Sequence, residues 1–286
     1  WAAGLDRVSA RLHAVDPVWF ATAFGAQAIA YVGYVLAYRE VARVDDGCDF
    51  PTRNVIAAVT AGFGPFIARG GFAVDVHAFK QAGLSDREVR VRVLGLGALE
   101  YALLAPAACI VAIQLLADGH SPSLGLTLPW AIAVPLGFVA ALWAVGRRED
   151  LRAHAGRRRH LAEALDSIQV LKTLFARRHA LAPLGTALYW FGDIFCLWAC
   201  LQAFTHGTPD ISLLLLGYAT GYALTRRTLP LGGAGAVDAL LPFALSWCGI
   251  SLAAAVLAVF AYRVFNLWLP TIPAALGLRS LRAHAV

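Results

Sequence analysis

Arginine side chains within apolar sequence are the groups in this chain whose chemistry is most specific. They are Arg69, Arg226, Arg227 and Arg263. A guanidinium group presents a planar fork of N–H donors that matches phosphate oxygens. An arginine near the centre of a bilayer costs about 2.5–3.5 kcal/mol on insertion scales, and it is kept mostly where it pairs or lines a polar path. We therefore expect these side chains to bind an anionic group such as a lipid phosphate.

Glycines lie beside, or a few residues after, three of these arginines. They are Gly70, Gly71, Gly232, Gly233 and Gly235. Glycine allows the backbone to approach a ligand closely, and the N–H groups at a helix start favour anions. The glycines are therefore expected to lie at the same headgroup-binding site as the arginines.

Acidic side chains in the same apolar stretches are candidates for balancing or gating the arginines. They are Asp75, Glu100, Asp193 and Asp238, with His77 as a residue that could carry a proton. Glu100 and Arg263 occupy matching positions in two similar segments, and an ion pair between them is predicted inside the membrane.

A structural interpretation stays open for each of these residues. Asp75 could pair with Arg69 merely to fix a helical hairpin, and Asp238 could do the same with one of the two adjacent arginines. Asp193 could pair with any of the arginines or bind a cation. His77 could be a hydrogen-bonded packing residue.

The composition places these residues in a membrane protein. The chain has 286 residues, of which 59% are hydrophobic and 15% are charged, whereas a soluble domain averages about 45–50% apolar and about 25% charged residues. Because the apolar residues come in long runs, an ordinary soluble enzyme is excluded and an all-α polytopic integral membrane protein is predicted. The basic residues behind the net charge of +6 are almost all arginines, and nucleic acid is not expected as a partner.

Several apolar runs are long enough to span a bilayer as helices. They are Val18–Tyr38, Val91–Ala117, Leu126–Val145, Leu181–Phe204 and Ile250–Gly277. Two further runs, Val55–Phe79 and Ile211–Trp247, contain Gly, Pro and charge near their middles and are predicted to be broken or re-entrant helices. Backbone groups that such breaks leave unpaired need protein, water or a ligand as partners, which favours a polar cavity.

A polar segment between the third and fourth uninterrupted runs, residues 146–179, carries most of the excess positive charge. By the positive-inside rule, the basic loop 147–179 and the C-terminus are cytoplasmic. Apolar residues recur in the loop with helical spacing at Leu161, Leu165, Ile168, Leu171 and Phe175, opposite Glu163, Asp166 and Gln169. This amphipathic helix is predicted to lie either at the inner membrane surface or docked on the helix bundle as a linker.

An internal repeat relates the two interrupted runs. Each contains a proline, then a Gly-Gly pair, then Ala-Val-Asp, and then Gly-Leu-Ser or Gly-Ile-Ser before a long helix. The expected topology inverts one copy relative to the other, and inverted repeats with broken helices are typical of transporters. We therefore predict one transmembrane domain, residues 1–286, with repeats at about 18–117 and 181–278 joined by the basic linker at about 146–180.

Motifs of soluble catalysis are absent from the sequence. It contains no GxxxxGK(S/T) phosphate loop, no GxGxxG, no HExxH and no GxSxG. The five cysteines show no metal-ligand spacing. No catalytic residue, metal or cofactor is therefore predicted. The sequence contains no methionine, and its first residue, Trp1, is not expected to be the native start.

Two segments resemble the signatures of a known family. Leu229–Leu241 and Val259–Gly277 resemble the C-terminal signature of the transmembrane domain of bacterial lysylphosphatidylglycerol synthase/flippases and their stand-alone relatives. Residues 61–85 resemble the first motif of that family. The matching residues are Pro65, Gly70, Gly71, Asp75, Pro230, Gly232, Gly233, Gly235, Asp238, Tyr262, Arg263 and Pro270. The chain departs from the pattern at Asp238, where the family usually has Glu, at His77, near where it often has Arg, and at the adjacent Arg226 and Arg227.

The resemblance implies movement of an anionic, aminoacylated or lipid-linked phospholipid between the leaflets of a bacterial inner membrane. Membrane phospholipids would be the partners, and a soluble lipid-modifying enzyme or a second copy of the chain are further possible partners. Two other functions stay open. One is a membrane-embedded enzyme subunit that modifies lipid headgroups, with Asp75 and His77 as acid and base. The other is a non-catalytic scaffold whose basic loop recruits a partner.

Overall fold

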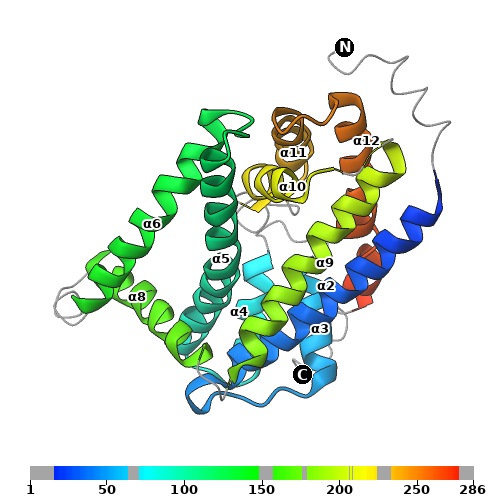
Figure 1. Ribbon diagram of the computed structural model, residues 1–286. Helices are drawn as coiled ribbons and strands as arrows, with labels where there is room; N and C mark the ends of the chain where they lie inside the picture. The colour runs from blue at the N-terminus through cyan, green and yellow to red at the C-terminus, as the bar shows by residue number, and fades with distance from the viewer. Residues whose placement is uncertain are drawn as a thin grey trace.

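Helices make up the regular structure of this chain (Figure 1). The computed structural model describes residues 16–63, 71–147, 157–175, 179–205, 207, 209–223 and 233–276. The helices are α2 (Val18–Arg43), α3 (Thr52–Phe63), α4 (Gly71–Gln81), α5 (Asp86–Ala117), α6 (Leu124–Gly146), α8 (Arg157–Leu174), α9 (Leu181–Phe204), α10 (Ile211–Tyr218), α11 (Ala236–Trp247) and α12 (Leu252–Arg263). Short helical turns are η1 (Val44–Asp46) and the π-helical η3 (Ala219–Ala223) and η5 (Val264–Trp268). Within the described ranges there is no strand, and the predicted all-α class is confirmed.

Membrane-spanning helices occur where the apolar runs predict them. Among the described residues, five helical segments are long and apolar enough to cross a membrane. They are Val18–Arg43, Asp86–Ala117, Leu124–Gly146, Leu181–Phe204 and Leu252–Leu276, the last of which continues α12 through η5. The chain is therefore a multi-pass membrane protein.

The second of these spans begins five residues earlier than the apolar run predicts. Ser85 accepts a hydrogen bond at its hydroxyl from the backbone N–H of Glu88, and the Glu88 carboxylate accepts one from the backbone N–H of Ser85 at 2.8 Å. This reciprocal capping box satisfies two donors of the first turn, so the helix begins at the polar residue Asp86. Hydropathy alone places the boundary at Val91 because it does not detect caps.

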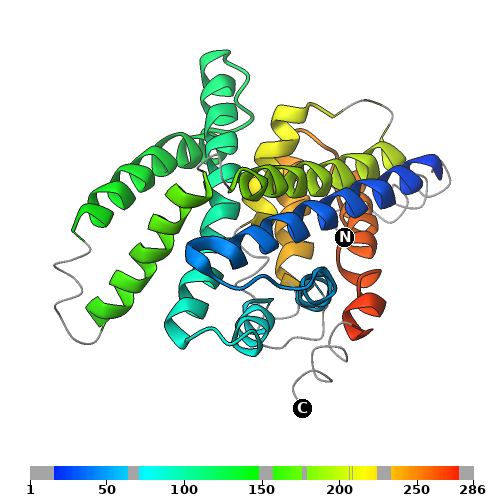
Figure 2. The same cartoon turned by 90° about the horizontal axis from the view of Figure 1, so that it is seen from below.

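α2 and α9 form the closest helix pair in the fold, side by side along much of their length in both views (Figures 1 and 2). A Cβ atom added at Gly33 would lie 2.5 Å from the backbone oxygen of Gly185, and one at Gly192 would lie 2.6 Å from the backbone oxygen of Ala26. Small residues at these positions allow the two backbones to come into direct contact. The pair forms a tight support for the polar side chains that α9 carries.

Both interrupted runs contain separate helical segments, as predicted. Val55–Phe79 is divided between α3 and α4, and Ile211–Trp247 between α10, η3 and α11. The second run shows the role of glycine directly, because Gly233 and Gly235 have φ of 71° and 82°, which L-residues rarely adopt. The inverted-repeat relation and the re-entrant course of these segments stay predictions.

The predicted amphipathic helix of the basic loop is α8, and it docks on α5 and α6 (Figure 2). Leu165 and Leu174 are buried, which agrees with the predicted apolar face. Asp166 differs from the prediction, because it is buried and forms an ion pair with Arg87 of α5 at 2.9 Å. Phe175, predicted on the apolar face, is exposed just beyond the end of α8. Of the two placements predicted for this helix, docking on the bundle matches these contacts.

Candidate functional site

A buried carboxylate at the middle of α9 is the centre of the polar structure inside the bundle. Asp193 has no solvent exposure. Its oxygen Oδ2 accepts hydrogen bonds from the hydroxyls of Tyr218 and Tyr262, the latter at 2.6 Å, and Oδ1 accepts one from the amide of Asn266 at 2.7 Å. Burying a carboxylate is costly unless its oxygens are hydrogen-bonded. These three donors therefore allow an acid to persist at this depth.

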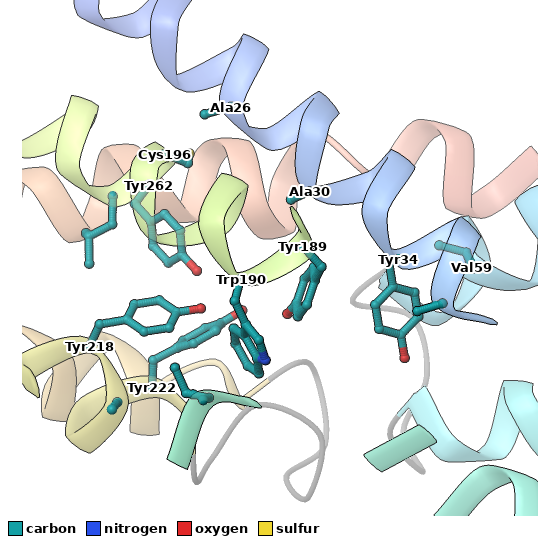
Figure 3. Close-up of a cluster of buried hydrophobic side chains, with 14 of the residues drawn as sticks. Ala26, Ala30, Tyr34, Val59, Tyr189, Trp190, Cys196, Tyr218, Tyr222 and Tyr262 are labelled. Carbon is teal, nitrogen blue, oxygen red and sulfur yellow. The ribbon is translucent and has the colours of Figure 1, made fainter. Parts of the chain in front are cut away.

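The donors come from three different elements that converge on α9. Tyr218 ends α10, Tyr262 lies in α12, and Asn266 follows one turn later in η5. The spacing of four residues places Tyr262 and Asn266 on the same helical face. Figure 3 shows the hydroxyls of Tyr218 and Tyr262 directed toward each other. The carboxylate thus links α9 to α10 and to the span formed by α12 and η5.

The π-helical turns η3 and η5 meet at this network. Tyr222 of η3 donates a hydrogen bond to Oδ1 of Asn266 at 3.1 Å, and Nη1 of Arg263 lies 3.5 Å from the same oxygen. π-Helical turns within helices occur frequently at functional sites because they displace side chains from the regular spacing. Asn266 therefore connects Asp193 to Arg263 through its amide.

Arg263 is held by an acid at the start of α11. Its Nε lies 2.9 Å from Oδ1 of Asp238, and the other oxygen of Asp238 accepts a hydrogen bond from the backbone N–H of Gly235 at 3.0 Å. The Arg263 side chain is 3% exposed, whereas the Asp238 side chain is 30% exposed. This ion pair therefore runs from the buried network toward an accessible surface.

The ion pair differs from the one that the sequence predicts. Arg263 was expected to pair with Glu100, but in the described part of the chain its ion-pair partner is Asp238. The physical reason is proximity, because α11 and α12 are consecutive helices that pack against each other. Glu100 is nevertheless buried, as expected for an acid with an interior role, and its carboxylate accepts a hydrogen bond from Tyr34 at 2.9 Å.

A row of aromatic rings joins the surroundings of the two buried acids (Figure 3). The indole N–H of Trp190 donates to the backbone oxygen of Glu100 at 2.9 Å. The Trp190 ring lies 4.7 Å from Tyr189 and 6.0 Å from Tyr218, measured between ring centroids. Trp190 thus stands between Glu100 on α5 and the Asp193 network.

The candidate residues of α4 lie on different sides of their helix. Asp75 is buried, whereas His77, two residues later, is exposed. Residues two apart on a helix do not face each other. The geometry therefore does not bring Asp75 and His77 together as an acid and base pair.

Several predicted ligands lie outside the described residues. They are Arg69, Gly70, Arg226, Arg227 and Gly232. Of their neighbours, Gly71 begins α4, and Gly233 and Gly235 precede α11 in a left-handed backbone conformation. The described site therefore contains one of the four predicted phosphate-binding arginines, Arg263.

Sequence reasoning missed the neutral members of the network. They are Tyr34, Tyr218, Tyr222 and Asn266. Asn266 carried a detectable signal, because it is a polar residue in a membrane-spanning helix one turn after Tyr262. The tyrosines gave no comparable signal, since tyrosine is common both in apolar interiors and at membrane interfaces.

Comparison with known proteins agrees with this architecture. No curated protein sequence matches the chain. One family model, described as the lysylphosphatidylglycerol synthase TM region, matches residues 1–274 and so covers nearly the whole chain. The chain, an all-helical multi-pass membrane protein with a buried polar network, belongs to the lysylphosphatidylglycerol synthase transmembrane region family.

Proposed function

We propose that this protein translocates an anionic, aminoacylated or lipid-linked phospholipid headgroup across the membrane. Membership of a family named for lysylphosphatidylglycerol synthesis supports a lipid-related role. The observation that carries the proposal is the Arg263–Asp238 ion pair, which places a nearly fully buried guanidinium group next to a partly exposed acid. Arg263 lies in a candidate membrane-spanning segment, where a charged residue is costly and typical of substrate pathways.

The mechanism rests on exchange of the anion that faces Arg263. Asp238 neutralises the guanidinium group while no lipid is present, and the phosphate of a lipid replaces it when the headgroup enters. Asp238 keeps its hydrogen bond to the backbone N–H of Gly235, so the start of α11 stays capped during the exchange. Asn266 and the Asp193 network hold α9, α10 and α12 together around the moving headgroup.

The test is translocation in proteoliposomes. The chain is reconstituted with headgroup-labelled anionic, zwitterionic and aminoacylated phospholipids, and dithionite is added to bleach the label that reaches the outer leaflet. Arg263→Ala is compared with Arg147→Ala, which changes an exposed arginine at the end of α6. Arg263→Lys keeps the positive charge but loses the planar fork. Arg69→Ala examines a predicted ligand that lies outside the described residues.

If the protein translocates lipid, the inner-leaflet label of at least one lipid class should lose its protection from dithionite only when the protein is present. Arg263→Ala should lower the rate at least about tenfold, because a charge-assisted hydrogen bond contributes about 1.5–3 kcal/mol. Arg147→Ala should retain the original rate. Folded wild-type protein that accelerates no lipid of the panel, or an Arg263→Ala variant as fast as Arg147→Ala, would contradict the proposal.

The alternative of an enzyme subunit that modifies headgroups has less support. It assigned acid and base roles to Asp75 and His77, which lie on different sides of α4. The scaffold alternative depends on the basic loop, and it predicts that Arg263→Ala leaves every activity unchanged. The proteoliposome comparison therefore also separates translocation from a scaffold role.

A further inference from the structure

An apolar groove lies beside the polar network, between α5, α9 and α10. Its volume is about 420 Å³, within the range of about 300–1,000 Å³ typical of ligand sites. Its lining consists of aliphatic and aromatic side chains from these three helices. The groove is a separate feature from the Arg263–Asp238 pair, because none of the network's charged residues lines it.

The groove is open on one side and closed on the other. Phe191 and Ile211 at its rim are 59% and 69% exposed. Leu104 and Leu214, which also line it, are 2% and 1% exposed. The groove therefore has a buried floor and a lateral opening.

The position of the groove along α9 predicts that its lateral opening faces hydrocarbon rather than water. The groove residues on α9 run from Ala187 to Trp198, which places them about 9–26 Å along a helix about 36 Å long at about 1.5 Å per residue. The hydrocarbon core of a bilayer is about 30 Å thick. The groove thus lies at the depth of lipid acyl chains.

The wall formed by α9 contains stacked aromatic rings. Phe191 and Phe195 stack with a centroid distance of 5.6 Å, and Phe195 and Trp198 stack at 5.0 Å. Residues 187, 190, 191, 194, 195 and 198 recur at helical spacing, so one face of α9 supplies the whole wall. Aromatic pairs of this kind contribute about 0.5–1.5 kcal/mol beyond their area burial, which favours this arrangement of the wall.

Trp190 connects the groove to the proposed headgroup pathway. The Trp190 side chain lines the groove, its indole N–H donates a hydrogen bond to the backbone oxygen of Glu100, and its ring lies 6.0 Å from the ring of Tyr218 in the Asp193 network. An apolar chain in the groove would therefore lie next to a residue that also borders the Asp193 network, where the headgroup of the same amphipathic molecule could bind.

We propose that the groove between α5, α9 and α10 binds an acyl chain of the lipid whose headgroup enters the polar network. The inference rests on the proposed function for the headgroup, but the occupancy of the groove can be measured separately. An apolar lining at hydrocarbon depth with a lateral opening fits an acyl chain better than a polar ligand, whose polar groups would lose their hydrogen bonds to water there.

The experiment is photo-cross-linking in vesicles of phosphatidylcholine and phosphatidylglycerol. A small fraction of the phosphatidylglycerol carries a diazirine near the end of one acyl chain, and labelled residues are mapped by mass spectrometry. Ala187→Trp and Ala107→Trp fill the groove from two helices. Ala133→Trp is the matched control, because it adds the same side chain to an exposed position on α6 outside the groove.

If the groove binds an acyl chain, labelling of groove residues should exceed labelling of the exposed side of α6 by about tenfold. The groove-filling variants should lose that excess, and Ala133→Trp should keep it. Equal labelling of the groove and of α6 would identify ordinary boundary lipid and overturn the inference. Cross-links from groove residues to a second copy of the chain would also overturn it.

The two proposals can fail separately. Selective groove labelling in a protein that moves no lipid would contradict the proposed translocation and leave the acyl-chain site in place. Translocation by a protein whose groove shows no excess labelling would contradict the acyl-chain site alone. Folding of each variant is checked by its elution profile in detergent before either assay.

Discussion

α9 and α6 are both apolar membrane-spanning helices, but they have opposite surroundings. In an apolar 18-residue stretch of α9, 61% of the residues are buried inside the protein, whereas in the corresponding stretch of α6 only 6% are buried. Figure 1 shows α9 against α2 and α6 leaning away on the other side of α5. Both helices contain several Ala and Gly residues, so the number of small residues does not explain the difference. In α9, Gly185 and Gly192 lie against the backbone of α2 and Asp193 binds side chains of other helices. In α6, by contrast, no atom lies within 4 Å of a Cβ added at Gly137. An apolar composition favours the membrane for both helices, and small or polar residues placed against a neighbouring helix allow protein contacts.

Overfilling the α2–α9 contact should have the largest effect. Gly33→Leu places a side chain where even a Cβ atom would lie 2.5 Å from the backbone of α9. Overpacking costs about 1–3 kcal/mol or more, and here the obstacle is backbone that cannot rotate away. We expect a large loss of folded protein, measured by size-exclusion chromatography after heating in detergent. Gly25→Leu on the same helix is the control, because no atom lies within 4 Å of its added Cβ.

Removing the buried carboxylate should have the next largest effect. Asp193→Leu leaves the donors of Tyr218, Tyr262 and Asn266 without their acceptor. A buried donor left unpaired costs about 1–3 kcal/mol. We expect a lower melting temperature for Asp193→Leu than for Asp193→Asn, which keeps one acceptor oxygen. Equal melting temperatures for the two variants would show that the hydrogen bonds do not stabilise the bundle.

Breaking the contact between α8 and α5 should have a small effect. Asp166→Asn removes the ion pair with Arg87, whose side chain is 60% exposed. The Arg87 end of the pair is solvent-exposed, so we expect a contribution like that of surface ion pairs, about 0.2–1 kcal/mol, which weakens in salt. The melting temperature of Asp166→Asn should lie slightly below that of the original protein at low salt, and this difference should shrink at high salt because the pair is then already screened. A large loss at both salt concentrations would contradict this interpretation.

Truncating an exposed residue of α6 should have the smallest effect. Leu136→Ala changes a side chain that is 63% exposed, and such changes are expected to fall within about 0.5 kcal/mol. Leu197→Ala makes the same chemical change at a fully buried position of α9 and should cost about 2–5 kcal/mol. Thermal denaturation of both variants measures the difference directly. A strong destabilisation by Leu136→Ala would show that α6 is covered by protein in the membrane.

Prediction from the sequence was most successful for membrane-spanning helices, whose position is decided by the length of an apolar run. The span Leu181–Phe204 agrees with α9 at both ends, and the interrupted runs contain separate helical segments. It was less successful at helix starts and polar contacts. Asp86 begins α5 because Ser85 caps it, and Asp166 is buried because Arg87 reaches it from another helix. Such errors arise because caps and ion pairs depend on single atoms rather than on average polarity.

The candidate site was predicted in its residue types more than in its pairings. Arg263 was expected to bind a lipid phosphate, and Asp193 and Asp238 to balance or gate the arginines. All three take part in the described network, and those roles stay predictions. The pairing of Arg263 with Asp238, and the contribution of Asn266, follow from which helices pack together. A single sequence contains no direct record of those contacts.

The sequence by itself determined the membrane setting, the helical class, the spans and the presence of charged residues within them. These properties follow from local composition, because a bilayer accepts long apolar helices almost irrespective of their neighbours. Only the tertiary structure decided which donors surround Asp193, which acid holds Arg263, and that a groove opens between α5, α9 and α10. Those features need side chains from distant segments at distances of a few ångströms, which helix packing alone can set.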